Sequence, residues 1–326
     1  MTTTARPDRV PVTLSTARRP SGRRVVGPGR GRRWAEITLL VGPALLLYST
    51  FVIVPMLLAL YYSFFDWNGI GPLDDFVGLD NYARAVGDSQ FRNAVAHNLL
   101  IVVLSIVIQL PMGLALAMLL NRRLRGRAVL RMVLFAPYVL AEVTTAVAWL
   151  LILQPSGPAD QLLRALGLEA WTQLWLADRQ LVLYTLFVVI TWKYVGFAII
   201  LFLAGLQGIP SDLLEAATVD GASAWQRTRY ITLPLLGPTI RIWIFLSVIG
   251  SLQIFDLVWI MTRGGPAGAS SSMATFLIDR GFQRSQFGYG SALAVLLFVI
   301  SFAFALLYQR YVLRRDTEGA VTGGVR

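Results

Sequence analysis

The sequence predicts an all-α, polytopic membrane protein with six transmembrane helices, both termini in the cytoplasm, and a long cytoplasmic loop between helices four and five. Three observations predict this fold class: composition, six long apolar stretches, and the distribution of arginine. Of 326 residues, 56% are hydrophobic and only 14% are charged, and the mean hydropathy is +0.61. A soluble domain of this length needs more charge to cover its surface. The composition therefore indicates a membrane protein.

Six stretches are long enough to cross a bilayer, whose hydrocarbon core of roughly 30 Å requires about 20 apolar residues in a helix. The first contains Gly42, Pro43 and Pro55, which predict a tilt or kink. No small-residue cleavage site follows a short apolar core, so we interpret this stretch as an uncleaved anchor. The six predicted spans cover residues 37–64, 96–120, 130–153, 181–205, 236–262 and 289–311.

Arginine predicts the orientation of these spans. Nine arginines lie in residues 1–36 and five in the short loop 121–131, and the same side also receives the loop 206–241 and the C-terminal end. That side holds 21 arginines, whereas the opposite side holds seven. Because basic loops stay in the cytoplasm, the richer side is predicted to be cytoplasmic, with both termini on it.

The arginine-rich residues 1–36 are predicted to form a disordered cytoplasmic tail. The net charge of +11 would also suit a nucleic-acid-binding protein, but the basic residues lie where they set topology and approach anionic lipid head groups. We therefore expect contact with membrane lipid and not with nucleic acid. The predicted organisation is a tail (1–36), a transmembrane domain (37–315) and a second cytoplasmic tail (316–326).

The residue inventory excludes most enzyme chemistry. Cysteine is absent, His97 is the single histidine, and Lys193 is the single lysine. A thiolate or histidine metal cluster, a cysteine nucleophile and a Ser-His-Asp triad are therefore not available. A phosphate-binding loop requires G-x-x-x-x-G-K-[ST], and Lys193 lies in an apolar span between Trp192 and Tyr194. We expect no catalytic residue, metal or cofactor on this chain.

The loop 208–234 between spans four and five is amphipathic and too polar to cross a bilayer. Ser211 is predicted as the N-cap of a short helix, with Asp212 in its first turn. Gly221 can adopt the left-handed conformation that ends such a helix. A second helix is predicted from residue 222 to about 231, stopped by Pro234 before span five. Two short helices on the membrane surface are expected.

The same loop contains the pattern E-A-A, three residues, G, nine residues, I-x-L-P. It resembles the EAA motif of permease subunits of binding-protein-dependent ABC importers, and D-G-A around the glycine completes the usual form. The matching residues are Glu215, Ala216, Ala217, Asp220, Gly221, Ala222, Ile231, Leu233 and Pro234.

The resemblance implies that residues 208–234 are a coupling-helix loop that docks in a groove of a separate ATPase. It implies an ABC ATPase dimer that carries ATP and magnesium, a second EAA-type permease, an extracytoplasmic solute-binding protein, and a bacterial inner-membrane location. A short rigid helix with small residues permits close docking, and Glu215 supplies a charge for the partner. The implied ATPase-coupling residues are Glu215, Ala216, Ala217, Asp220, Gly221 and Ala222.

Four further runs resemble the carbohydrate-uptake group of these permeases, the maltose and glycerol-3-phosphate type. They are residues 76–82, 204–210, 262–266 and 287–292, and the resemblance covers about residues 37–315. It implies a subunit that forms half of the pathway for a sugar or oligosaccharide. The alternatives are an importer permease for glycerol-3-phosphate, a polyamine or an amino acid, and a secondary transporter, which would not need the EAA loop.

Three ionisable residues, Glu142, Lys193 and Asp256, lie inside the predicted spans. Charged groups inside a bilayer cost about 2.5–3.5 kcal/mol each on insertion scales and mark functional sites. We therefore expect Lys193 to pair with Glu142 or Asp256.

The resemblance to maltose-type permeases implies that the spans before and after the loop hold the solute. Aromatic faces stack on sugar rings while hydroxyl and amide groups bind sugar hydroxyls, although aromatic residues here could also simply pack against neighbouring helices. Ile190 and Ile254 stand where the maltose permease has polar pathway residues, which argues against maltose itself. The candidate pathway residues are Trp192, Lys193, Tyr194, Phe197, Ser251, Gln253 and Asp256.

Overall fold

The computed structural model describes residues 30–122 and 125–313, and within these ranges the chain is helical. The described ranges also contain one isolated antiparallel β-bridge, between Phe65 and Phe76. The chain divides after Pro55 into two units. The predicted tails lie largely outside the described part of the chain: residues 1–29 and 314–326 are not described.

The first unit contains helix α1 (Arg30–Tyr48) and a π-helical turn (Ser49–Ile53), after which α2 (Val54–Tyr62) begins. Residues 30–36, predicted as part of the tail, are helical in α1. The expected irregularity of the first span lies at the π-helical turn. Pro55 has no N–H and its ring crowds the carbonyl four residues earlier, so the preceding turn widens. The apolar stretch suited to a membrane covers Thr38–Tyr62.

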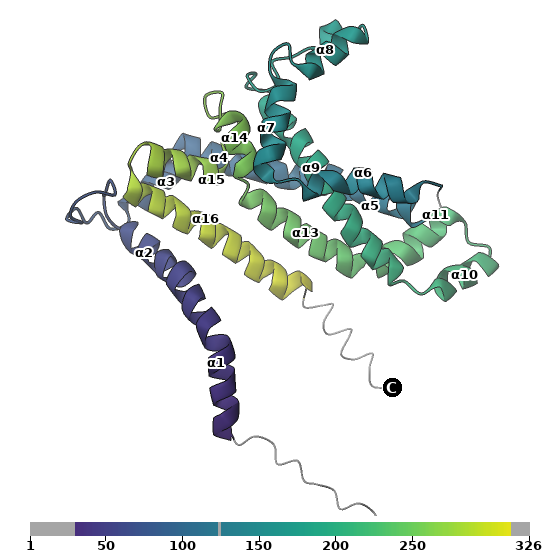
Figure 1. Ribbon diagram of the computed structural model, residues 1–326, viewed down its shortest axis with the longest axis horizontal. Coiled ribbons are helices and arrows are strands. Elements are labelled where there is room, and N and C mark those ends of the chain that lie inside the picture. The colour runs from purple at the N-terminus through teal and green to yellow at the C-terminus, as the bar shows by residue number, and fades with distance from the viewer. Residues whose placement is uncertain (1–29, 123–124, 314–326) are drawn as a thin grey trace, which may run out of the picture. The chain divides into compact units, whose positions relative to one another are not determined.

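The second unit contains the remaining helices, shown in Figure 1. Four further apolar stretches suited to a membrane are Ser89–Asn121, Val182–Gln207, Gly237–Thr262 and Phe287–Leu313. They comprise α4 (Ser89–Leu104), a π-helical turn (Ser105–Gln109), α5 (Leu110–Asn121), α9 (Val182–Gln207), α13 (Gly237–Leu252), α14 (Asp256–Thr262), α16 (Phe287–Tyr308) and a π-helical turn (Gln309–Leu313).

Shorter helices connect these stretches. They are α3 (Asp80–Gly87), α6 (Arg127–Val139), α7 (Glu142–Leu153), α8 (Pro158–Ala165), a 3₁₀ turn (Glu169–Trp171), α10 (Ser211–Val219), α11 (Ala224–Arg227), a π-helical turn (Thr228–Thr232), α12 (Leu233–Leu235), α15 (Met273–Ile278) and a π-helical turn (Asp279–Gln283). In Figure 1, α10 and α11 lie at one end of this unit, remote from α8 and α14.

The third predicted span is not a continuous helix. Within 130–153, α6 ends at Val139 and α7 begins at Glu142, and the two helices are bent by 100°. Leu140 and Ala141, between them, have extended backbone with ψ of 143° and 145°. The predicted span is therefore broken in the structure into two helices. The described residues contain five helices suited to crossing a membrane, or six if the bent pair is one span.

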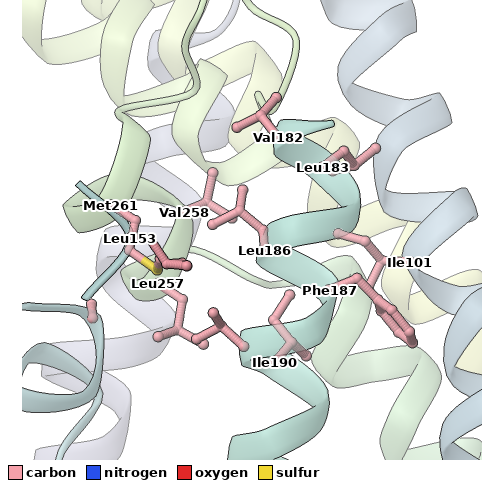
Figure 2. Close-up of a cluster of buried hydrophobic side chains, with 12 residues drawn as sticks. Ile101, Leu153, Val182, Leu183, Leu186, Phe187, Ile190, Leu257, Val258 and Met261 are labelled. Atoms are coloured by element: carbon pink, nitrogen blue, oxygen red, sulfur yellow. The ribbon is translucent and has the colours of Figure 1, made fainter. Parts of the chain in front are cut away.

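Helix α9 is the centre of the second unit. Its most apolar window is 61% buried, against 28–33% for the other three stretches of this unit. Its first half packs against α14 and the end of α7 through the apolar cluster in Figure 2, where Leu186 lies between Val258 and Phe187. Its second half packs against α5 and α13 in a separate cluster around Phe202 and Trp243.

Two glycines allow close approach to α9. A Cβ on Gly196 would lie 2.6 Å from the backbone oxygen of Leu134, so α6 packs directly on the α9 backbone at this point. A Cβ on Gly113 would lie 2.7 Å from the Cβ of Ala198, which brings α5 equally close. Small residues at such contacts are typical of helices that pack inside membranes.

Asn98 holds the second interruption of an apolar stretch, between α13 and α14. Its side chain is fully buried. Nδ2 donates to the carbonyl oxygens of Ser251 (2.6 Å) and Leu252 (3.1 Å), and Oδ1 accepts from the N–H of Met273 (2.9 Å). Carbonyls at the end of a helix lack intrahelical partners, so a buried amide that bonds to them stabilises the break.

Candidate functional site

A cavity of about 340 Å³ lies where the two interrupted helices meet α9 and the π-helical turn between α4 and α5. Non-helical backbone at membrane depth is tolerated where it is buried in protein or lines a polar cavity. The cavity is lined by Ser105, Gln109, Tyr138, Glu142, Ile190, Tyr194, Phe197, Trp243, Leu246, Ser247, Gly250, Ser251, Gln253, Ile254, Phe255, Asp256 and Leu257.

Lys193 holds the bend between α6 and α7. Its Nζ donates to the carbonyl oxygen of Leu140 (2.6 Å) and lies 3.9 Å from Oε1 of Glu142. The Tyr194 hydroxyl donates to the same carboxylate oxygen. The cation therefore lies at the C-terminal end of α6 and the anion in the first turn of α7, so each charge complements the dipole of its helix end. Of the two partners expected for Lys193, the structure shows Glu142.

Five of the seven candidate pathway residues line the cavity, and two do not. Trp192 packs edge-on against Trp149 with ring centroids 5.4 Å apart. Lys193 is 2% exposed and points to the helix bend. The five lining residues are Tyr194, Phe197, Ser251, Gln253 and Asp256.

Several lining residues were not among the candidates. Glu142 is one of the three ionisable residues within the predicted spans but is not one of the candidate pathway residues. Ser105 and Gln109 are buried polar side chains in an apolar helix, a signal that could have found them. These two residues are the first and last of a π-helical turn, a local irregularity that is common at functional sites. The sequence pattern around Tyr138 and Trp243 does not distinguish them from packing aromatics.

Aromatic rings and polar groups share the cavity wall. Tyr138 stacks on Phe197 with ring centroids 5.3 Å apart, and its ring edge meets Tyr194 at 6.3 Å. Ile190 and Ile254 add apolar surface. The hydroxyl and amide groups come from Ser105, Gln109, Ser247, Ser251 and Gln253. An apolar wall with a few polar groups suits a small ligand that has both flat apolar faces and hydroxyl groups.

The EAA loop forms a second feature, around the end of α10. Gly221 has a φ of +80°. The N–H of Gly221 donates to the carbonyl of Thr218 (3.1 Å), and that of Ala222 donates to the carbonyl of Ala217 (2.9 Å). This pair of hydrogen bonds is a Schellman motif. The predicted left-handed glycine is confirmed.

The start of α10 and the second helix of the loop differ from the prediction. The N-cap is Pro210, whose ψ of 129° is not helical, and Ser211 is the first helical residue. The Ser211 hydroxyl donates to the Asp212 carboxylate and does not cap the helix. The second helix begins at Ala224, after a capping box between Ser223 and Gln226. Pro234 does not stop this helix. It lies at the first turn of α12, where a missing N–H costs no hydrogen bond.

The EAA residues present an exposed surface. Glu215, Ala216, Asp220 and Gly221 are exposed, while Ala217 and Ala222 are half-buried. Arg227 joins the two loop helices through a hydrogen bond to the Thr218 hydroxyl. Beside them lies a shallow hollow of about 330 Å³, lined by Asp220, Gly221, Ala222, Gln226, Arg227, Tyr230 and Ile231.

In the described ranges, no three His, Cys, Asp or Glu side chains gather in a way that could hold a metal ion.

Comparison with known proteins identifies relatives over nearly the whole chain. The family model described as binding-protein-dependent transport system inner membrane component matches residues 109–316. The chain is 33% identical to the trehalose/maltose transport system permease protein MalF of Thermococcus litoralis, over 83% of this chain and 91% of that protein. It is 30% identical to the diacetylchitobiose uptake system permease protein NgcF of Streptomyces coelicolor, over 96% and 93%.

Among solved structures, the fold is similar to a chain of a bacterial ABC transporter involved in the import of the acidic polysaccharide alginate. The TM-score is 0.76 at 24% identity, and the match covers 87% of this chain and 96% of that chain. A second structure of a bacterial alginate ABC transporter, in complex with an alginate pentasaccharide-bound periplasmic protein, gives the same TM-score at 23% identity. At these identities the likeness concerns the fold alone.

Proposed function

Because the chain belongs to the family of inner membrane components of binding-protein-dependent transport systems, we propose that it forms half of the translocation pathway for a sugar or oligosaccharide. As a member of this family the chain is a transport component and not an enzyme. The observation that carries the proposal is the cavity between the two interrupted helices, with stacked Tyr138 and Phe197 beside hydroxyl and amide groups.

The names of the relatives support a sugar as the solute. MalF and NgcF are named for trehalose or maltose and for diacetylchitobiose, and each is at least 30% identical across more than four fifths of this chain. Neither of these two relatives is named for glycerol-3-phosphate, a polyamine or an amino acid. A secondary transporter would not belong to a binding-protein-dependent family, so that alternative is not retained.

The EAA loop is proposed to couple the pathway to an ATPase dimer on partner chains, which would bind ATP and magnesium. The exposed Glu215 and the small exposed residues at the end of α10 support this role, since a rigid, capped helix transmits force better than a mobile loop. The full assembly is proposed to include a second EAA-type permease and an extracytoplasmic solute-binding protein, in a bacterial cell membrane. Both termini and residues 208–234 would face the cytoplasm.

The coupling role is tested at Gly221. A Cβ there meets no atom within 4 Å, so a side chain would fill the surface without a clash inside this chain. We expect Gly221→Asp to reach the membrane in normal amount but to lose uptake and co-purification with the ATPase. Gly167 is a matched control, since it too has positive φ and open space but lies far from the loop in sequence. Normal uptake by Gly221→Asp would refute the coupling assignment.

The sugar assignment is tested with the solute-binding protein that works with this permease. Calorimetry against a panel of disaccharides, polyols, polyamines and amino acids should find binding of a sugar. Deletion of the permease gene should then abolish uptake of that sugar. Binding of an amino acid or polyamine in place of a sugar would contradict the proposal.

A further inference from the structure

We propose that this cavity takes an uncharged or cationic sugar and rejects anionic ones, and that Asp256 enforces the choice. The inference deepens the sugar-permease function proposed above and rests on it. It concerns the substrate class of the cavity and follows from the charges of its wall.

The described wall of the cavity contains two carboxylates and no basic side chain. Glu142 and Asp256 are the acidic residues among the lining residues, whose remaining members are aromatic, aliphatic, hydroxyl or amide side chains or glycine. A site that recognises a carboxylate, phosphate or sulfonate normally presents an arginine or lysine to it. The composition of the lining therefore disfavours binding of an anionic ligand.

The nearby lysine does not alter this balance at Asp256. Lys193 is 2% exposed, its Nζ donates to the Leu140 carbonyl, and its nearest carboxylate is Glu142 at 3.9 Å. Its charge therefore offsets that of Glu142 and the C-terminal end of α6. Lys193 is not a lining residue, so it cannot reach a ligand in the cavity.

Asp256 carries the charge that has no cationic side-chain partner among the described residues. It is exposed in the first turn of α14, and no basic side chain of the described residues lies within 4.0 Å of its carboxylate. If Glu142 and Lys193 are counted as one neutral pair, the Asp256 carboxylate leaves the described cavity wall with a net charge of about −1.

This charge has opposite effects on acidic and basic sugars. At an effective dielectric constant of about 20, two like charges roughly 8 Å apart repel strongly enough to weaken binding by about tenfold or more. A sugar amine at the same distance is attracted instead. A neutral sugar loses nothing, because its hydroxyl groups can donate to the carboxylates.

The experiment uses three disaccharides of one linkage geometry that differ in charge: cellobiose, cellobiouronic acid and the diamine of chitosan. The full-length chain is assembled with its second permease and ATPase in lipid nanodiscs, without the solute-binding protein, so that the binding protein's own selectivity does not enter. Calorimetry at mildly acidic pH, where the amines are protonated, gives the dissociation constants. Maltose serves as a second neutral probe.

We expect cellobiouronic acid to bind at least about tenfold more weakly than cellobiose, and the diamine to bind as tightly or more tightly. Asp256→Asn should abolish the difference between the acid and the neutral sugar, and an unchanged gel-filtration profile of the assembled variant checks that it is folded. Asp256→Glu should keep the difference. Asp74→Asn is the matched control, since Asp74 is exposed and does not line the cavity, and it should leave all the constants unchanged.

Equal binding of the acid and the neutral sugar, or a difference that survives Asp256→Asn, would overturn the inference and leave the sugar function standing. If neither cellobiose nor maltose nor either charged disaccharide bound, the sugar assignment of the cavity would fall, and the charge preference with it.

Discussion

Replacing Lys193 by methionine tests whether the bend between α6 and α7 depends on one buried cation. Methionine keeps the length and apolar stem of lysine but removes the charge and all three donors. The Leu140 carbonyl then loses its hydrogen bond, and Glu142 keeps Tyr194 as its one partner among the described residues. We expect Lys193→Met to insert into the membrane but to be clearly less stable than the wild type.

The magnitude follows from the two contacts. A hydrogen bond from a charged donor contributes about 1.5–3 kcal/mol net, and the Nζ to Leu140 distance of 2.6 Å is short. The ion pair at 3.9 Å is worth less than its gross Coulomb energy, because the Glu142 side chain is 33% exposed and screened by solvent. Allowing about 1 kcal/mol for the pair, we expect a loss of about 3 kcal/mol, within the range for breaking buried pairs.

The assay is thermal unfolding of the purified protein in nanodiscs. For a chain larger than 250 residues, about 3 kcal/mol lowers the Tm by about 6 °C. Arg284→Met is the matched control: its Nε lies only 2.9 Å from Asp279, but both side chains are more exposed, at 53% and 38%. An exposed pair contributes at most about 1 kcal/mol, so this control should lower the Tm by no more than about 2 °C.

The pairing itself is tested by combining Lys193→Met with Glu142→Gln. Because the second change removes the carboxylate that the first leaves unpaired, the double variant should lose less stability than the sum of the single variants. Additive losses, or a loss in Lys193→Met no greater than in Arg284→Met, would refute the reasoning.

Two further substitutions test how the second unit is held together. Asn98→Leu should lower the Tm by at least about 6 °C, because it leaves the Ser251 and Leu252 carbonyls and the Met273 N–H without their buried partner, at about 1–3 kcal/mol for each buried group; a Tm within 2 °C of the wild type would contradict the proposed role of the amide. Gly196→Ala should also destabilise the protein, because its Cβ would stand 2.6 Å from a backbone oxygen of α6. Gly250→Ala is the matched control: its Cβ would meet no atom within 4 Å, so it should be neutral or slightly stabilising in the same thermal assay.

Local sequence signals predicted several features correctly. The five long apolar stretches were recognised because membrane insertion depends on the summed hydropathy of consecutive residues. The end of α10 at Gly221 was predicted because a left-handed cap depends on the residue at that one position. The family was identified from motif spacing inside one loop.

Features that depend on distant residues were not predictable in the same way. The apolar residues of 130–153 predict one continuous helix, but the structure breaks it at Leu140. Lys193, 53 positions away in the sequence, stabilises the break by donating a hydrogen bond to the free Leu140 carbonyl. The sequence predicts Ser211 as the N-cap of α10, whereas the structure places the cap one residue earlier, at Pro210. Both residue types suit the start of a helix, so the local sequence does not distinguish the two positions. The role of Lys193 also changed, from a pathway candidate to a residue that holds Glu142 beside the cavity.

The sequence by itself thus determined the membrane class, the loop that carries the EAA motif and the family, because each of these depends on composition or on residues close together in the chain. Only the tertiary structure decided which polar residues share a cavity and which lie behind its wall. Trp192, Lys193 and Tyr194 are consecutive, yet only Tyr194 lines the cavity, since successive residues of a helix point about 100° apart. Which of these directions faces α6, α14 or open space is set by how the helices pack.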